Sequence, residues 1–168
     1  MLGVEANPDF FLKCLIIKNQ FRLDNVEFVY GDCMEVLSRP RFRQAPWFDV
    51  CICSGIIYHM EDPLAFIDLV VGTAPTIYVW TQVASESFPK GDWTELQDGE
   101  MRTYKVRRNN YTTEKHWGGV STGAYWMTEE SVVQAFADRG FNAQDLERQL
   151  SPSGDAVSFI ARRGDVVV

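Results

Sequence analysis

The chain has 168 residues, of which 46% are hydrophobic and 23% are charged, a composition typical of a soluble globular domain with one core. The formal net charge of −7 disfavours a protein that binds nucleic acid through a broad basic surface. The apolar runs are far shorter than the roughly 20 residues that a membrane helix needs, and the N-terminus lacks a secretion-signal pattern. We therefore expect a cytoplasmic protein.

The four cysteines, Cys14, Cys33, Cys51 and Cys53, fall in or beside predicted helices and strands. This placement indicates reduced, packed thiols. Cys51 and Cys53 would share one face of a strand, and no further Cys or His follows at zinc-site spacing. Core cysteines are therefore favoured over a metal site.

The N-terminal third predicts a strand, a helix and a second strand. Residues 1–5 form the first strand, and Asn7 caps a helix that has Pro8 in its first turn. Residues 26–30 form the second strand and end at a glycine and an aspartate. The helix carries apolar residues spaced for one face, namely Phe11, Leu12, Leu15 and Ile16.

Residues 48–63, FDVCICSGIIYHMEDP, are the most informative stretch. The uncharged run up to Ser54 predicts a strand that is buried on both faces of a parallel sheet. Asp62 and Pro63 predict the start of a helix. The loop between them carries Tyr58 and His59, at the strand ends where ligands bind in open α/β sheets.

The alternation of strands and helices continues with a buried strand over residues 76–82 and then ends. Residues 84–124 are a long insertion, in which residues 101–107 and 111–116 are predicted to pair as a hairpin across residues 108–110. The aromatic residues of the insertion favour an ordered lid or a substrate wall. Its five basic and two acidic residues between positions 100 and 115 are more typical of a solvated hairpin face than of a patch for an anionic substrate.

The C-terminal part predicts a helix and a strand pair. Thr128 caps the helix in the pattern TEES, and Gly140 ends it. Strands over residues 145–150 and 156–162 are joined by a short turn, which implies antiparallel pairing. The order of elements predicts an α/β fold, a three-layer sandwich with a C-terminal antiparallel hairpin.

Two segments resemble class I S-adenosylmethionine-dependent methyltransferases. FDVCICSGIIYHMEDP is similar to the segment around the fourth strand of the enzymes that methylate sugars and small molecules or modify the wobble uridine of tRNA. YWMTEESVVQAFADRGF is similar to the segment around the last helix of that group. The resemblance implies a Rossmann-like sandwich of the class I methyltransferase type, with S-adenosylmethionine as cofactor and a small-molecule, sugar or tRNA acceptor.

The resemblance also implies where the cofactor lies. Glu5 matches the acidic residue that accepts hydrogen bonds from both ribose hydroxyls, and Ala6 and Asn7 follow it in GVEAN. Asp32 matches the residue that accepts from the adenine amino group, with the backbone amide of Cys33 beside it. Both acids have an alternative reading, because Glu5 could support the next helix's N-terminus and Asp32 could be an ordinary helix cap.

The loop after the fourth-strand motif would face the reacting groups. The resemblance implies that Ser54 and Gly55 line the methionine side of the cofactor, and that Tyr58 and His59 face the methyl group. Methyl transfer from a sulfonium mostly needs alignment and desolvation, so a tyrosine wall and one proton acceptor suffice. His59 is a candidate general base, a substrate-positioning donor or a structural residue.

The insertion and the residues directly after it supply the candidate acceptor-binding residues Arg107, Tyr111, Tyr125 and Trp126. His116 lies in the same insertion and is expected to be exposed.

One element of the family pattern is absent from this sequence. Family members begin with a strand that ends in a glycine-rich turn, and the chain has no G-x-G-x-x-G. The resemblance therefore implies a domain that is incomplete on its N-terminal side: a fragment, a degenerate domain, or a sheet that closes over the gap. We expect weak or no cofactor binding by this chain alone, and a homo-oligomer or partner chain that covers an open sheet.

Three functions follow from these observations. The first is methyl transfer, which predicts cofactor binding that depends on Glu5 and Asp32. The second is a non-catalytic methyltransferase-like module that binds or regulates a partner. The third is a nucleotide-binding oxidoreductase, because an acid after a strand also suits a NAD ribose, although the loop with Tyr58 and His59 fits it poorly.

Overall fold

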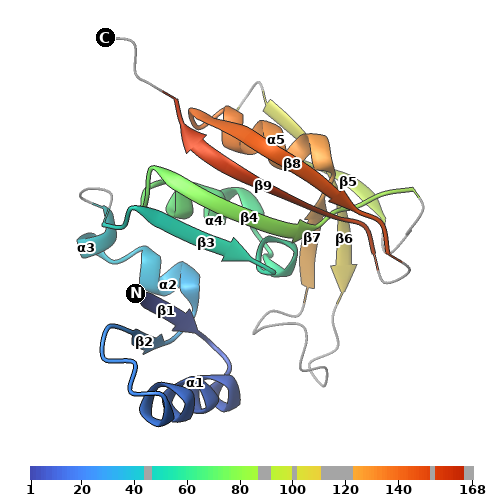
Figure 1. The fold of residues 1–168 in the computed structure, drawn as a ribbon. Coiled ribbons are helices and arrows are strands. Elements are labelled where there is room, and N and C mark those ends of the chain that lie inside the picture. The colour runs from blue at the N-terminus through green and yellow to red at the C-terminus, as the bar shows by residue number, and fades with distance from the viewer. Residues whose placement is uncertain (44–46, 87–91, 100–101, 111–122, 152–153, 165–168) are drawn as a thin grey trace.

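The computed structural model describes residues 1–43, 47–86, 92–99, 102–110, 123–151 and 154–164. In these residues the strands form three sheets, two of which begin with parallel pairs as the sequence predicts. Figure 1 shows the whole arrangement, with the first strand pair and its helix set below the larger sheet.

The largest sheet has the strand order β3-β4-β9-β8. β3 (Val50–Ser54) and β4 (Thr76–Gln82) run parallel. β9 (Ala156–Arg163) lies antiparallel between β4 and β8 (Phe141–Gln149), which confirms the predicted C-terminal hairpin.

The two smaller sheets come from the N-terminus and from the insertion. β1 (Leu2–Glu5) and β2 (Glu27–Tyr30) form a parallel pair. β5 (Trp93–Asp98), β6 (Arg102–Asn110) and β7 (Gly123–Met127) form an antiparallel sheet with β6 in the centre.

Side-chain caps fix where four helices begin. The sequence predicts three of these caps, and it leaves Asp32 open between a cap and a ligand-binding acid. In each case a side-chain oxygen accepts a hydrogen bond from a backbone amide of the first turn. The caps are Asn7 for α1 (Pro8–Gln20), Asp32 for α2 (Cys33–Leu37), Asp62 for α4 (Pro63–Val71) and Thr128 for α5 (Glu129–Ala137). The described residues also include α3 (Pro40–Arg43) and the 3-10 helix η1 (Ile57–His59).

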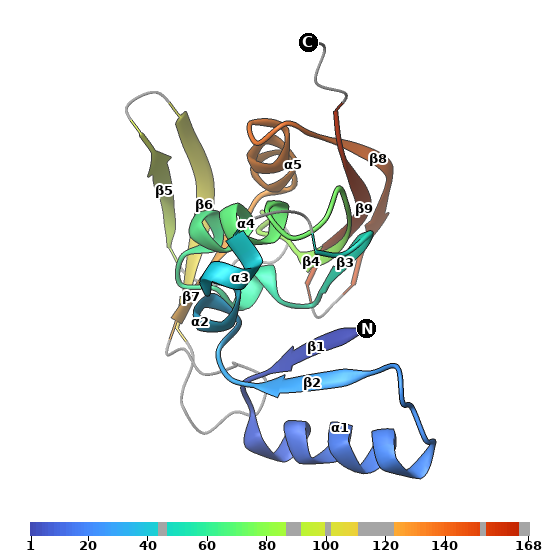
Figure 2. The same cartoon turned by 90° about the vertical axis from the view of Figure 1, so that its left-hand side faces the viewer.

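The core lies where three layers meet. Figure 2 shows α4 and α5 between the four-stranded sheet and the sheet of the insertion. Each layer contributes fully buried side chains, among them Ile77, Val79, Tyr104, Val106, Phe136 and Phe159. The insertion is thus an ordered structural layer over its described residues, and its burial of apolar area stabilises the fold.

The prediction that the strand ending at Ser54 is buried on both faces is wrong. Only Cys53 of β3 is fully buried, whereas Val50 is 52% exposed and Ile52 is 71% exposed. Figure 1 looks onto this face of the sheet and shows α4 and α5 behind it, with no helix in front of β3 and β4. Within the described part of the chain, the apolar sequence of β3 therefore lacks a covering layer on one side.

The helix α1 is also less buried than the sequence predicts. Its apolar residues were expected to bury one face, but none of its residues is buried. Phe11 contacts the ring of Tyr30 on β2, with 5.4 Å between ring centroids. Leu12 and Ile16 are 56% and 63% exposed, because the helix packs only on the narrow β1-β2 pair.

The hairpin predicted inside the insertion is also wrong. Its turn was placed at residues 108–110, but β6 continues through these residues and pairs with β5 and β7. β5 was not predicted, because its sequence WTELQD is mostly polar. The predicted partner strand, with Tyr111 and His116, lies outside the described residues.

The cysteines are free thiols, as expected. Burial raises the pKa of Cys51 and Cys53, so both thiols stay protonated at neutral pH. Among the described residues, no three His, Cys, Asp or Glu side chains gather as a potential metal site. No helix in this part of the chain is long and apolar enough to span a membrane.

One arginine joins the insertion to the two helices beneath it. The Arg139 guanidinium donates to Asp68 of α4 at 2.6 and 3.1 Å and to Asp98 of β5 at 3.0 Å. Only 8% of its side chain is exposed. This bidentate, buried geometry suits arginine and not lysine.

We predict that Arg139→Lys lowers the free energy of unfolding by about 1–3 kcal/mol, because the forked hydrogen bonds to Asp68 and Asp98 cannot all form. Urea unfolding followed by circular dichroism measures the change. Arg148→Lys is the matched control, since the Arg148–Glu129 pair is exposed on the arginine side and should contribute little. Equal losses of unfolding free energy in Arg139→Lys and Arg148→Lys would contradict a stabilising role of the Arg139 hydrogen bonds.

Candidate functional site

A cavity of about 390 Å³ lies at the carboxyl ends of β1 and β2, next to the loop that follows β3. We call it the acidic cavity. Its described lining residues are Val4, Glu5, Ala6, Gly31, Asp32, Cys33, Met34, Ile56, His59, Met60, Glu61 and Asp62. The structure thus brings together Glu5, Asp32 and His59, which the sequence placed in three separate segments.

Glu5 and Asp32 each hold a backbone amide with one oxygen. Glu5 Oε1 accepts from the amide of Asn7 at 2.7 Å, and Asp32 Oδ1 accepts from the amide of Met34 at 2.6 Å. Among the described residues, neither second carboxylate oxygen accepts a hydrogen bond. The sequence left open whether each acid supports a helix or binds a ligand. The two roles are compatible, because each acid can support a helix with one oxygen and still present the other to a ligand.

Gly55 sets the path of the loop after β3. Its φ is +73°, a conformation that glycine adopts without strain, and its amide donates to the carbonyl of Trp80 at 2.8 Å. A Cβ at this position would lie 3.7 Å from the Trp80 ring and 3.8 Å from the Tyr58 hydroxyl. Ser54 is exposed at the strand end, and the chain then turns into η1.

The rings of Tyr58 and His59 pack on each other, with centroids 4.1 Å apart, but only one of them lines the cavity. His59 lines the acidic cavity, whereas Tyr58 does not. The Tyr58 ring packs edge-on against Trp80 and Trp126, with centroids 6.1 and 5.6 Å apart. The amide of Tyr125 donates to the carbonyl of Met60 at 2.9 Å, so β7 holds the other end of the loop.

Burial keeps the side chains of Tyr58 and His59 neutral. It lowers the pKa of His59 and raises the pKa of Tyr58, so an uncharged imidazole and a protonated phenol face this region at neutral pH. Burial and the neighbouring Asp32 charge raise the pKa of Cys33 to about 11. Cys33 is therefore a thiol and not a nucleophilic thiolate.

The charged residues among the described lining of the acidic cavity are all acidic. Glu5, Asp32, Glu61 and Asp62 contribute four carboxylates, and no Lys or Arg is among its described lining residues. Such a surface attracts cations and polar groups with hydrogen-bond donors, and it repels phosphates. The sequence analysis placed Asp62 only as a helix cap and missed Glu61, although the pair directly follows the YH motif.

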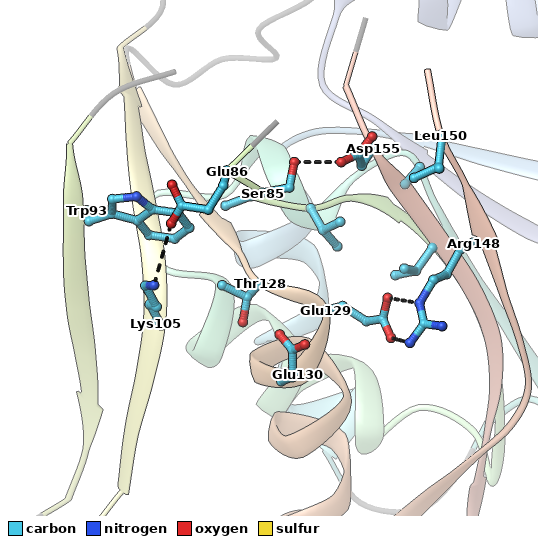
Figure 3. A pocket seen from close by; sticks show the side chains of 14 residues that line it. Ser85, Glu86, Trp93, Lys105, Thr128, Glu129, Glu130, Arg148, Leu150 and Asp155 are labelled. Atoms are coloured by element: carbon cyan, nitrogen blue, oxygen red, sulfur yellow. Dashed lines mark hydrogen bonds and ion pairs between the residues drawn. The ribbon is translucent and has the colours of Figure 1, made fainter. Parts of the chain in front are cut away.

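A second cavity, of about 330 Å³, lies between the N-terminus of α5 and the ends of β4, β6 and β8. Figure 3 shows that some of its charged side chains pair with one another, as Glu129 does with Arg148 and Glu86 with Lys105. None of the predicted cofactor residues lines it.

Of the predicted acceptor-binding residues, Arg107 lies away from the acidic cavity. Its guanidinium stacks on Trp93 at 3.9 Å from the ring centroid and contacts Glu86 at 3.4 Å. Trp126 is buried against Tyr58, and Tyr125 is half-buried. Tyr111 lies outside the described residues.

Sequence comparison gives no match to any family model or to any curated protein. Solved structures, however, share the fold. The N-terminal domain of EvdMO1 with SAH bound has a TM-score of 0.74 and 21% identity to this chain, and the match covers 96% of this chain. The chain spans 64% of that domain's length, which is less than two thirds.

Two further structures show the same fold at lower identity. The 1,6-didemethyltoxoflavin-N1-methyltransferase of Burkholderia thailandensis, with SAH bound, has a TM-score of 0.58 at 12% identity, covering 98% of this chain and 71% of its own. Magnesium protoporphyrin IX methyltransferase of Synechocystis PCC 6803, with SAM bound, has a TM-score of 0.57 at 14% identity, covering 97% of this chain and 59% of its own. The chain therefore has the α/β methyltransferase fold that the resemblance implied.

Proposed function

We propose that the acidic cavity binds S-adenosylmethionine and that the chain serves methyl transfer to a small-molecule acceptor. The charge of the cavity carries this proposal, since four carboxylates and no described Lys or Arg line it. The cofactor has a sulfonium and an ammonium group against one carboxylate, and its net positive charge suits this lining. The diphosphate of a nicotinamide dinucleotide does not, which disfavours the oxidoreductase alternative.

The donor and acceptor groups in the cavity fit the proposed ligand. The second oxygens of Glu5 and Asp32 are available for the ribose hydroxyls and the adenine amino group. Ala6, Asn7 and the backbone at Cys33 would complete the nucleoside end. The bound forms in the similar structures support the choice of ligand, because EvdMO1 and the toxoflavin enzyme hold SAH and the protoporphyrin enzyme holds SAM.

Ser54 and Gly55 are proposed for the methionine end of the cofactor. Gly55 lets the backbone come close, because glycine has no side chain. When bound, the cofactor supplies an electrophilic methyl group on sulfur. The protein's part is to hold the acceptor in line with that group and to exclude water.

His59 is the proposed proton acceptor for the methylated atom. Its imidazole lines the cavity and is neutral at pH 7, because burial lowers its pKa. Tyr58 stays protonated, because burial raises its pKa. Together with Trp80 and Trp126 it is proposed to form an aromatic wall. Tyr125 and Trp126 lie on β7, in the sheet of the insertion, and are proposed to line the acceptor's side of the site. A small molecule is favoured over tRNA because the chain carries a net charge of −7.

A second candidate function is a non-catalytic methyltransferase-like module that binds or regulates a partner. The exposed outer face of β3, with Ile52 at 71% exposure, favours this reading. It predicts a folded chain without measurable cofactor affinity. The same exposed face is the reason why we propose an incomplete domain and expect cofactor binding by the chain alone to be weak.

We predict that SAH shifts the backbone NMR resonances of Ala6, Cys33 and His59, with a Kd weaker than about 100 μM. Glu5→Gln should weaken binding by about tenfold or more, because it removes a charge-assisted hydrogen bond. Glu27→Gln, an exposed acid at the start of β2, is the control and should bind like wild type. NAD should cause no shifts.

A folded wild-type chain whose resonances do not respond to about 1 mM SAH would favour the non-catalytic module. If the Glu5→Gln chain binds SAH like wild type, the acidic cavity is not the cofactor site.

The lowered pKa of His59 predicts a pH dependence of stability. The unfolded chain takes up the proton at its ordinary pKa of about 6.5, and the folded chain does so only at lower pH. The stabilisation is therefore full above pH 6.5 and is lost as the pH falls toward the folded pKa. Urea unfolding between about pH 7 and pH 5 should show a smaller loss of stability for His59→Gln than for wild type.

His116→Gln, at the only other histidine of the chain, is the control for this measurement. If it flattens the pH profile as His59→Gln does, the profile does not report on His59.

A further inference from the structure

A buried arginine beside the second cavity has no part in the proposed reaction. The Arg107 side chain is only 6% exposed, and its guanidinium stacks on Trp93 at 3.9 Å from the ring centroid. Among the described residues its ion-pair partner is Glu86, whose Oε2 lies 3.4 Å from Nη2, and its Nε has no hydrogen-bond acceptor. A buried guanidinium with so few of its donors satisfied is costly, so Arg107 is short of an acceptor.

Lys105 brings a second positive charge to the same place. Residues two apart share a face of a strand, so Lys105 and Arg107 lie on one face of β6, and Trp93 lies opposite Arg107 on β5. The Lys105 Nζ lies 4.1 Å from the Trp93 ring centroid and 4.0 Å from Glu86 Oε1. Lys105, Trp93 and Glu86 all line the second cavity, where Figure 3 shows them together. The two cations therefore share one carboxylate at the cavity wall.

Glu86 is a weak partner for the two cations. Its side chain is 78% exposed, and its contacts of 3.4 and 4.0 Å are longer than the roughly 2.7–2.9 Å of a good charge-assisted hydrogen bond. Ion pairs with an exposed member contribute little to stability. The Glu86 side chain can therefore turn outward at small cost, and the place of its carboxylate can be taken by another carboxylate.

The rest of the second cavity suits the body of a small molecule. Its volume is about 330 Å³, within the range of ligand pockets, and it has an apolar part formed by Val83, Ala84, Ala156 and Val157. Its other acids do not compete for Arg107. Glu129 is held by both nitrogens of a fork on Arg148, Asp155 accepts from the Ser85 hydroxyl at 2.6 Å, and Glu130 is exposed to solvent.

We propose that the second cavity binds a small molecule with one carboxylate and an apolar body. The ligand carboxylate replaces that of Glu86 and accepts hydrogen bonds from Arg107 and Lys105, and the body packs on the apolar lining. A carboxylate is favoured over a phosphate, because a single negative charge replaces Glu86 without adding repulsion from the other acids. The two cavities share no described lining residue, so this ligand is held apart from the proposed cofactor.

The test is titration of hexanoate into the 168-residue chain without cofactor, followed by the backbone NMR resonances of Ala84 and Ala156. We expect saturable shifts with a Kd of about 1 mM, and binding of the neutral hexanamide that is weaker by about tenfold or more. Glu86→Gln should tighten hexanoate binding about threefold or more, because the competing carboxylate is gone. Lys105→Gln should weaken it by a similar factor. Arg108→Gln removes the same charge from an exposed residue on the other face of β6 and should have no effect.

Several results would overturn the proposal. They are equal binding of hexanoate and hexanamide, a Glu86→Gln chain that binds hexanoate no more tightly than wild type, and no response at about 20 mM. Tighter binding of hexylamine than of hexanoate would show that the acids select the ligand. Shifts at Ala6 and Cys33 in place of Ala84 and Ala156 would put hexanoate in the acidic cavity. The substituted side chains are exposed, so each variant should fold, and failure of SAH to bind has no bearing on these measurements.

Discussion

The parallel register between β3 and β4 is the constraint on which the candidate site depends. It aligns Ser54 with Trp80 at the strand ends, and the next amide, that of Gly55, donates to the Trp80 carbonyl. This bond directs the chain out of the sheet at a positive φ and into η1. The position of His59 at the acidic cavity follows from that turn. A shift of the register by one residue would exchange the faces of β3 and move the loop.

The acidic residues of the cavity hold the backbone around it as well as lining it. Glu5 and Asp32 accept hydrogen bonds from the amides of Asn7 and Met34, so the backbone around them is fixed before any ligand binds. Asp62 does the same for α4. Acceptors that are oriented in advance lose little freedom on binding, which favours ligand recognition. The accumulated negative charge opposes folding through mutual repulsion, and a cationic ligand relieves it.

Much of the local structure could be predicted from the sequence, because caps and strands are local signals. Asn7, Asp62 and Thr128 begin helices as predicted, and β4 has the predicted bounds. The exposure of Ile52 could not be predicted, since burial depends on what packs against a strand and not on the strand itself. β5 escaped prediction because its residues alternate weakly, and its position is fixed by pairing with β6. Only the η1 turn decides that His59, and not the adjacent Tyr58, lines the acidic cavity.

The central position of β9 has a consequence for how the chain folds. β9 pairs along the whole length of β4, joining Thr76 to Arg162 and Gln82 to Ala156, which are residues about 80 positions apart. During synthesis, β3, α4 and β4 leave the ribosome long before β9 can join them. One edge of β4 therefore stays open while the insertion and α5 are made. Such long-range closure slows folding and prolongs the lifetime of intermediates in which the β4 edge is unpaired.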